Sequence, residues 1–91
     1  MEKQVVLKIY GRVQGVFFRD STRQKAAELN LVGWVKNEPE GTIKIVAKGK
    51  EEKLKELIKW CYNGPRLAQV EKVDIEWQEA TGQFEEFEVK Y

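Results

Sequence analysis

Histidine is missing from this sequence of 91 residues, and cysteine occurs only once. Without histidine, the chain cannot build the Ser-His or Cys-His pairs that activate nucleophiles in many hydrolases. One cysteine and no histidine cannot supply the protein ligands of most zinc sites, and a single cysteine cannot form an internal disulfide. A hydrolase with this composition must work by positioning and electrostatic stabilisation, or with a carboxylate as its base.

An excess of charge is missing as well, because 16 basic residues accompany 15 acidic ones and the net charge is +1. Such a balance creates no long-range field that would attract nucleic acid or an anionic membrane. The sequence also lacks an apolar stretch of membrane-spanning length and a signal-peptide pattern. We therefore expect no nucleic-acid partner, no membrane partner and a cytoplasmic location, and any anion site must be local.

The length and composition predict one globular domain that spans residues 1–91, and we expect it to be a monomer. The chain is 42% hydrophobic and 34% charged, which is typical of a folded protein and not of a disordered one. A chain of this length buries only about 60–65% of its unfolded surface, so the core must be modest.

Alternation of apolar and polar residues predicts five β-strands. In the first of them, Val5, Leu7 and Ile9 share one face, which indicates a half-buried strand. The predicted strands span residues 3–13, 34–37, 42–47, 70–77 and 84–91.

Two helices are predicted between these strands. The clearer one spans residues 51–62, because apolar residues recur there at helical spacing and a glycine-proline pair follows. The other begins near Asp20 or Ser21, either of which can cap a helix. It ends at Asn30, a residue type that tolerates a left-handed conformation.

The order of elements is β-α-β-β-α-β with a short extra strand at the C-terminus. This order is typical of the ferredoxin-like split βαβ fold of the α+β class, in which two helices pack on one face of an antiparallel sheet. Because this fold carries many different activities, it does not by itself indicate a function.

A glycine-containing loop, residues 14–19, separates the first strand from the first helix. The start of a helix leaves backbone N–H groups unpaired and carries partial positive charge, so the loop can form an anion-binding site. Gly15 allows a sharp bend, and the planar guanidinium of Arg19 can contact two phosphate oxygens at once. The alternative interpretation is a tight turn that carries an exposed arginine.

Asn37 stands where a predicted strand enters a turn, a position at which asparagine is common for structural reasons. Its amide has both a donor and an acceptor, so it could also hold a water molecule in a fixed orientation. The residue pattern leaves both interpretations open.

Two further patterns favour structural roles. Cys61 and Arg66 are spaced as Cys-x4-Arg, which differs from the Cys-x5-Arg loop of protein tyrosine phosphatases. Cys61 also continues an apolar helix face, so we expect a buried structural thiol. The tryptophans Trp34, Trp60 and Trp77 could stack on RNA bases, but their spacing and the balanced charge favour packing in the core and on the sheet.

Two long motifs resemble the signatures of the acylphosphatase family. The first is the run from Ile9 to Arg19. The second starts with residues 33–37, which include Asn37, and continues with Gly41, Thr42, Ile43 and Gly49. Matches elsewhere extend the resemblance over nearly the whole chain. They include Ala26, Leu29, Leu31, Gly64, Pro65 and Phe87. Ile43, where valine is usual, and Asn30, where glycine is common, are small departures.

The resemblance implies an acylphosphatase, a metal-independent hydrolase without a cofactor. Its substrate would be a small acyl phosphate, and its products a carboxylate and inorganic phosphate. The implied catalytic residues are Arg19, which binds the phosphate, and Asn37, which orients the attacking water. The implied substrate-binding residues are Gln14, Gly15, Val16, Phe17, Phe18 and Arg19. The alternative is a non-catalytic anion- or ligand-binding module on the same fold.

Overall fold

Strand β1 (Glu2–Arg12) shows how the alternating pattern builds the core. Val5, Leu7 and Ile9 are fully buried on one face, as predicted, because successive side chains in a strand point to opposite faces. The computed structural model describes residues 2–91, so Met1 of the predicted domain lies outside the described residues. The other elements are α1 (Phe18–Glu28), β2 (Val32–Asn37), β3 (Ile43–Lys50), α2 (Glu51–Cys61), β4 (Gln69–Gln78) and β5 (Phe87–Lys90).

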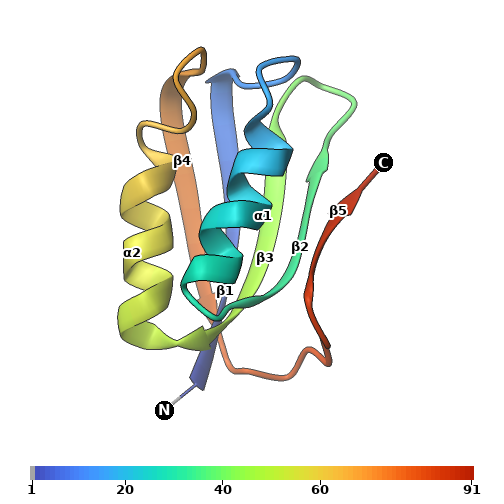
Figure 1. Ribbon diagram of the computed structural model, residues 1–91. Helices are drawn as coiled ribbons and strands as arrows, with labels where there is room; N and C mark the ends of the chain where they lie inside the picture. The colour runs from blue at the N-terminus through green and yellow to red at the C-terminus, as the bar shows by residue number, and fades with distance from the viewer. Residues whose placement is uncertain (1) are drawn as a thin grey trace.

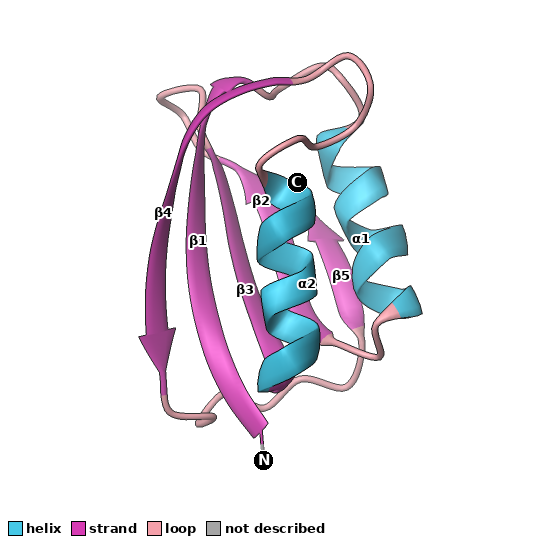
Figure 2. Cartoon of the chain, turned by 90° about the vertical axis from the view of Figure 1, so that its left-hand side faces the viewer, coloured by secondary structure: helices cyan, strands magenta, loops and turns pink. Residues whose placement is uncertain are grey.

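The strands form one sheet in the order β4-β1-β3-β2-β5. The pairs β1–β4, β1–β3 and β2–β3 are antiparallel. Both helices cover the same face of this sheet, which leaves the opposite face open (Figures 1 and 2). The arrangement confirms the predicted ferredoxin-like fold with an extra C-terminal strand.

Strand β5 makes the sheet mixed, whereas the sequence pattern predicted an antiparallel sheet. β5 runs parallel to β2, with Phe87 opposite Gly33. The chain leaves β4 at the end of the sheet where β2 begins, crosses that end, and enters β5 from the same side (Figure 1). A strand entered from there must run in the direction of β2, and residue alternation carries no information on that direction.

Helix α1 begins at Phe18, earlier than predicted, and neither Asp20 nor Ser21 caps it. Phe17 occupies the N-cap position in a left-handed conformation, with φ 64° and ψ 23°, and no side chain caps the helix. At the other end, Asn30 has φ 59°, which confirms the predicted left-handed conformation there.

The apolar face of α2 is buried as predicted, and it consists of Leu54, Leu57, Ile58 and Cys61. This face packs against β1 and β3 in the centre of the sheet. Among residues 2–91, no helix has the length and apolar character needed to cross a membrane.

The three tryptophans pack to different degrees, and Trp60 packs against the core. Trp34 and Trp60 are half-buried, and Trp77 on β4 is 42% exposed. Because α2 lies over β1 and β3, the edge strand β4 receives little cover from a helix. Trp77 therefore lies on the sheet, as one part of the prediction has it, but outside the core.

Candidate active site

Two residues in the loop between β1 and α1 are left-handed, Gly15 with φ 75° and Phe17 with φ 64°. A Cβ added at Gly15 would meet no heavy atom within 4 Å, so this position needs glycine for its backbone angle and not for space. Phe17 carries a side chain in the same region, which costs about 1–2 kcal/mol and persists only where the surrounding structure enforces it. Strain of this kind clusters at functional loops.

The start of α1 adds unpaired amides to this loop. The first helical hydrogen bond joins the Ser21 N–H to the Phe17 carbonyl oxygen at 3.0 Å. The N–H groups of Phe18, Arg19 and Asp20 therefore have no acceptor inside the helix. These amides and the partial positive charge of the helix start form a cradle for an anion.

Buried side chains hold the cradle in place. Val13, Val16 and Phe18 are all buried in the core beneath the loop. The Phe18 ring meets Trp60 of α2 edge to face, with ring centroids 5.5 Å apart. The core therefore enforces the strained backbone at Phe17.

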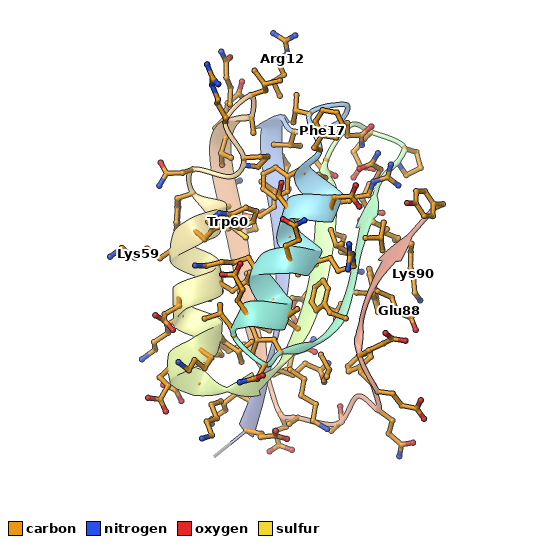
Figure 3. All side chains as sticks on the ribbon, viewed as in Figure 1. Arg12, Phe17, Lys59, Trp60, Glu88 and Lys90 are labelled. Atoms are coloured by element: carbon orange, nitrogen blue, oxygen red, sulfur yellow. The ribbon has the colours of Figure 1, made fainter. Side chains whose placement is uncertain are left out.

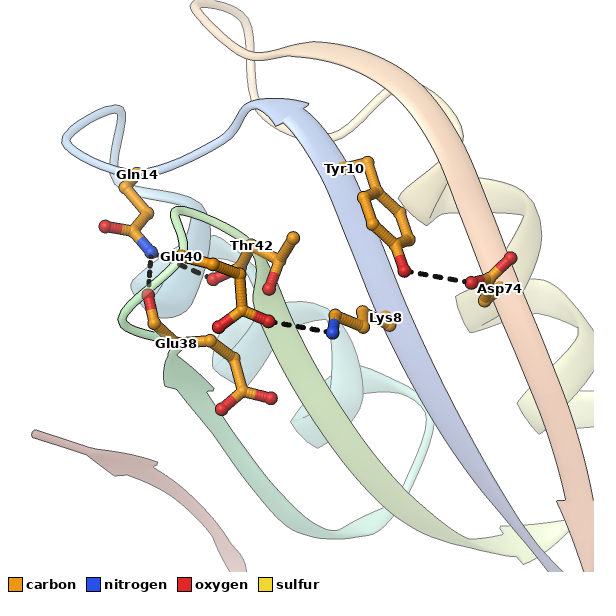
Figure 4. Close-up of polar contacts among 7 residues, drawn as sticks. All are labelled: Lys8, Tyr10, Gln14, Glu38, Glu40, Thr42 and Asp74. Carbon is orange, nitrogen blue, oxygen red and sulfur yellow. Dashed lines mark hydrogen bonds and ion pairs between the residues drawn. The ribbon is translucent and has the colours of Figure 1, made fainter.

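Gln14 ties the loop to the turn between β2 and β3. Its Nε2 donates to the carbonyl oxygens of Glu38 at 2.8 Å and Thr42 at 2.9 Å (Figure 4). The same turn carries Glu40, whose carboxylate pairs with Lys8 of β1 at 2.8 Å. The hydrogen bond from Lys8 lowers the pKa of Glu40, although an exposed pair of this kind contributes little to stability.

Arg19 and Asn37 line one cleft of about 230 Å³ between the cradle, the end of β2 and β5. The cleft is lined by Val13, Gly15, Phe17, Phe18, Arg19, Asp20, Asn37, Val89 and Tyr91. The structure thus brings together two residues from different motifs that are 18 positions apart in the sequence. Gln14 and Val16 are the two predicted substrate-binding residues that do not line the cleft, and their side chains hold the loop instead.

The Arg19 side chain is oriented by the C-terminal strand. Its Nη1 donates to the carbonyl oxygen of Lys90 at 3.2 Å, and its guanidinium carbon lies 4.7 Å from the ring centroid of Tyr91. No carboxylate in residues 2–91 lies within 4.0 Å of the Arg19 guanidinium nitrogens. Its positive charge is therefore available to an anion in the cleft.

The side-chain oxygen of Asn37 has no hydrogen-bond donor among the described residues, although it is buried. A buried acceptor without a partner costs about 1–3 kcal/mol, and such groups are uncommon in folded proteins. Asn37 also lines the cleft, so its amide is a candidate to hydrogen-bond a ligand or a water molecule there.

Sequence reasoning missed four residues of the cleft, one of which, Val13, was assigned only to the first strand. Val89 and Tyr91 come from the far end of the chain, and no local pattern links them to the loop. Asp20 was interpreted only as a helix cap, although its place next to Arg19 was a usable signal. In the structure, Asp20 lies in the first turn of α1, where an acidic group is favoured by the helix dipole.

Cys61 is a buried structural thiol, as predicted. Burial raises the pKa of Cys61 to about 12, so the reactive thiolate is scarce at neutral pH. In the part of the chain that the structure describes, no three His, Cys, Asp or Glu side chains gather so that they could hold a metal ion.

Gly64, in the connection between α2 and β4, packs directly against the cradle. Its φ is 66°, and a Cβ there would come within 2.5 Å of Cε2 of the buried Phe18 ring. We expect Gly64→Ala to lower the free energy of unfolding by about 2–4 kcal/mol, because backbone strain adds to the clash. Urea unfolding measures this loss.

Gly41→Ala is the matched control for this substitution. Gly41 also has a positive φ, 100°, but a Cβ there would meet nothing within 4 Å. It should therefore show the strain without the clash. Equal losses of stability in the two variants would contradict the contact between Gly64 and Phe18.

Known proteins resemble this chain in sequence and in fold. The acylphosphatase family model matches residues 5–89. The acylphosphatase of Salinibacter ruber is 46% identical, over 98% of this chain and 94% of that protein. The acylphosphatase structure from Coxiella burnetii has a TM-score of 0.92 and 39% identity, and covers 98% of this chain and 93% of that chain. The one from Bacillus subtilis has a TM-score of 0.94 and 31% identity, over the full length of both chains. Similarity that extends over nearly the whole chain, in sequence and in structure, shows that this protein belongs to the acylphosphatase family of hydrolases.

Proposed function

We propose that the cleft hydrolyses the carboxyl-phosphate anhydride bond of small acyl phosphates without a metal ion, with Arg19 and Asn37 as its catalytic residues. One observation carries the assignment of these residues. Asn37, whose buried side-chain oxygen has no donor among the described residues, lines the same cleft as Arg19, whose guanidinium has no carboxylate partner there. Membership of the acylphosphatase family supports the reaction itself.

Arg19 and the loop, residues 14–19, bind the phosphate group. The unpaired amides at the start of α1 donate to phosphate oxygens, and the helix dipole favours the negative charge. The Arg19 guanidinium contacts two oxygens at once, which also fixes the orientation of the phosphate. These groups stabilise the charge that spreads over the phosphate oxygens in the transition state.

Asn37 orients the attacking water. Its amide oxygen accepts a hydrogen bond from the water, which directs a lone pair of the water oxygen toward phosphorus. A bond forms between the water oxygen and phosphorus while the bond from phosphorus to the carboxylate oxygen breaks in line. The carboxylate leaves with the bonding electrons, so it needs no general acid. The water proton passes to a phosphate oxygen, which is consistent with a chain that contains no histidine.

Hydrolysis of benzoyl phosphate in the presence of EDTA tests this function. We expect turnover well above the spontaneous rate, unchanged by EDTA and by added magnesium. Loss of turnover in EDTA would contradict metal independence. Phosphate binding without any turnover would favour the alternative, a non-catalytic anion-binding module on the same fold.

We also propose that the protein is a monomer in the cytoplasm and that it binds no partner besides its substrate and its product. Light scattering on the purified protein measures the mass, and a dimer at micromolar concentration would contradict this part.

A further inference from the structure

A second hollow of about 330 Å³ lies beside the catalytic cleft, and we call it the lateral hollow. It is lined by Val16, Phe17, Ser21, Pro65, Arg66 and Leu67. Phe17 belongs to both the lateral hollow and the cleft, so the two spaces meet at this side chain. Figure 3 shows Phe17 at the end of the molecule where the connection between α2 and β4 also lies.

The walls of the lateral hollow expose large apolar side chains to water. Phe17 is 71% exposed and Leu67 is 62% exposed, and they line it together with Pro65 and Val16. Single exposed apolar residues are common on protein surfaces, but here several line one concave space. An apolar group placed between them would remove both side chains from water. Arg66 also lines the hollow, and an arginine side chain can offer its aliphatic stem to an apolar group.

The lateral hollow is held at a fixed place relative to the phosphate cradle. Gly64 packs against the Phe18 ring, which connects the α2–β4 segment to the start of α1. A hydrogen bond from the Ala68 N–H to the Pro65 carbonyl oxygen, 3.0 Å long, closes the turn that carries Leu67. Because these walls are already formed, an occupant gives up little binding energy to order them.

Phe17 connects the cleft and the lateral hollow, because it starts α1 and lines both spaces. Its left-handed conformation starts the helix whose amides face the anion, and it sends the ring outward between the cleft and the lateral hollow. A group bonded to a phosphate in the cradle can therefore extend over this ring into the lateral hollow. On the other side of the cleft, the Tyr91 ring already lies against the Arg19 guanidinium.

We infer that the lateral hollow is the subsite for the acyl group, and this inference rests on the proposed function. The substrate class is acyl phosphates with an extended apolar or aromatic acyl group. Acetyl phosphate has a single methyl group beyond the carboxyl carbon and is too short to cross the Phe17 ring. Longer apolar acyl groups reach Leu67 and Pro65 and bind more tightly.

The test compares hexanoyl phosphate with acetyl phosphate in the wild-type protein and in two variants. We expect wild-type kcat/KM to be about tenfold higher for hexanoyl phosphate, which corresponds to burying about half of the four added methylene groups. Leu67→Ser should lower this ratio about fivefold, through KM for hexanoyl phosphate. Leu67→Met should retain the ratio, because methionine keeps a similar apolar volume.

Tyr62→Ser is the matched control. Tyr62 is 53% exposed at the same end of the molecule, but it does not line the lateral hollow. It should leave both substrates unaffected, and thermal unfolding checks that all variants are folded. If the kcat/KM ratio of hexanoyl phosphate to acetyl phosphate is near one in the wild type, or is unchanged in Leu67→Ser, the subsite is wrong and the proposed hydrolase activity is unaffected. Absence of hydrolysis of both substrates by the wild type would instead overturn the proposed function.

Discussion

Replacing Arg19 with alanine is expected to remove phosphate binding and nearly all turnover while the protein remains folded. The Arg19 guanidinium supplies a positive charge to the cleft, and it has no carboxylate partner among the described residues. Loss of an arginine that stabilises a phosphoryl transition state costs about 10³–10⁵-fold in turnover. The fold tolerates the change, because Arg19 makes only one exposed hydrogen bond and one contact with an aromatic ring. Calorimetric titration with phosphate and the rate of benzoyl phosphate hydrolysis measure the two effects.

Arg23→Ala is the control for Arg19→Ala, because it removes the same charge one turn further along α1. Arg23 is exposed and does not line the cleft, so both activity and phosphate affinity should stay near wild type. Arg19→Lys separates charge from shape, since lysine keeps the charge but loses the planar fork. We expect it to bind phosphate weakly and to turn over slowly. Rates close to wild type in Arg19→Ala would remove Arg19 from the catalytic residues.

Replacing Asn37 with alanine is expected to have a different effect, in which turnover falls and phosphate affinity is largely kept. If the amide positions the attacking water, its loss should reduce kcat by about 10²–10³-fold, as for other single positioning groups. Phosphate itself remains bound by Arg19 and the amides of the loop. The substitution also removes the buried oxygen that lacks a partner, so the free energy of unfolding should not fall by more than about 1 kcal/mol.

The pair of variants is more informative than either alone. Asn63→Ala serves as a control for Asn37→Ala, because Asn63 is exposed beyond the end of α2. Equal losses of phosphate affinity in the Arg19 and Asn37 variants would mean that Asn37 helps to bind the anion and does not orient water. A kcat in Asn37→Ala within threefold of the wild type would exclude it from the reaction.

The alternation of apolar and polar residues predicted the four strands that form the core of the fold, because a strand with one buried face repeats every two residues. The buried residues of β1 and α2 follow from spacing alone, since each face repeats within a few residues. The direction of β5 does not follow from spacing, because it depends on where the chain crosses the end of the sheet. The exposure of Trp77 likewise depends on how far α2 reaches over the sheet.

The candidate site was predictable only in the parts that lie within continuous motifs. Arg19 and Asn37 were predicted from the motifs, and both line one cleft in the structure. The left-handed N-cap at Phe17 was missed, because a residue with a side chain adopts that conformation only under constraint from distant packing partners such as Trp60. The contact of Arg19 with the Lys90 carbonyl joins residues 71 positions apart, and no local rule reports such a contact.

The exposed position of β4 has a consequence for how copies of the chain meet one another. Its outer edge offers backbone hydrogen-bonding groups along ten residues, and such an edge can template intermolecular strand pairing and fibrils. Charged side chains interrupt the strand at Glu71, Lys72, Asp74 and Glu76, and each would lose hydration if a second strand docked there. At the opposite edge, β5 spans only Phe87–Lys90 and gives little length for pairing. The two edges of the sheet are thus protected against association in different ways: β4 by its charged side chains and β5 by its short length.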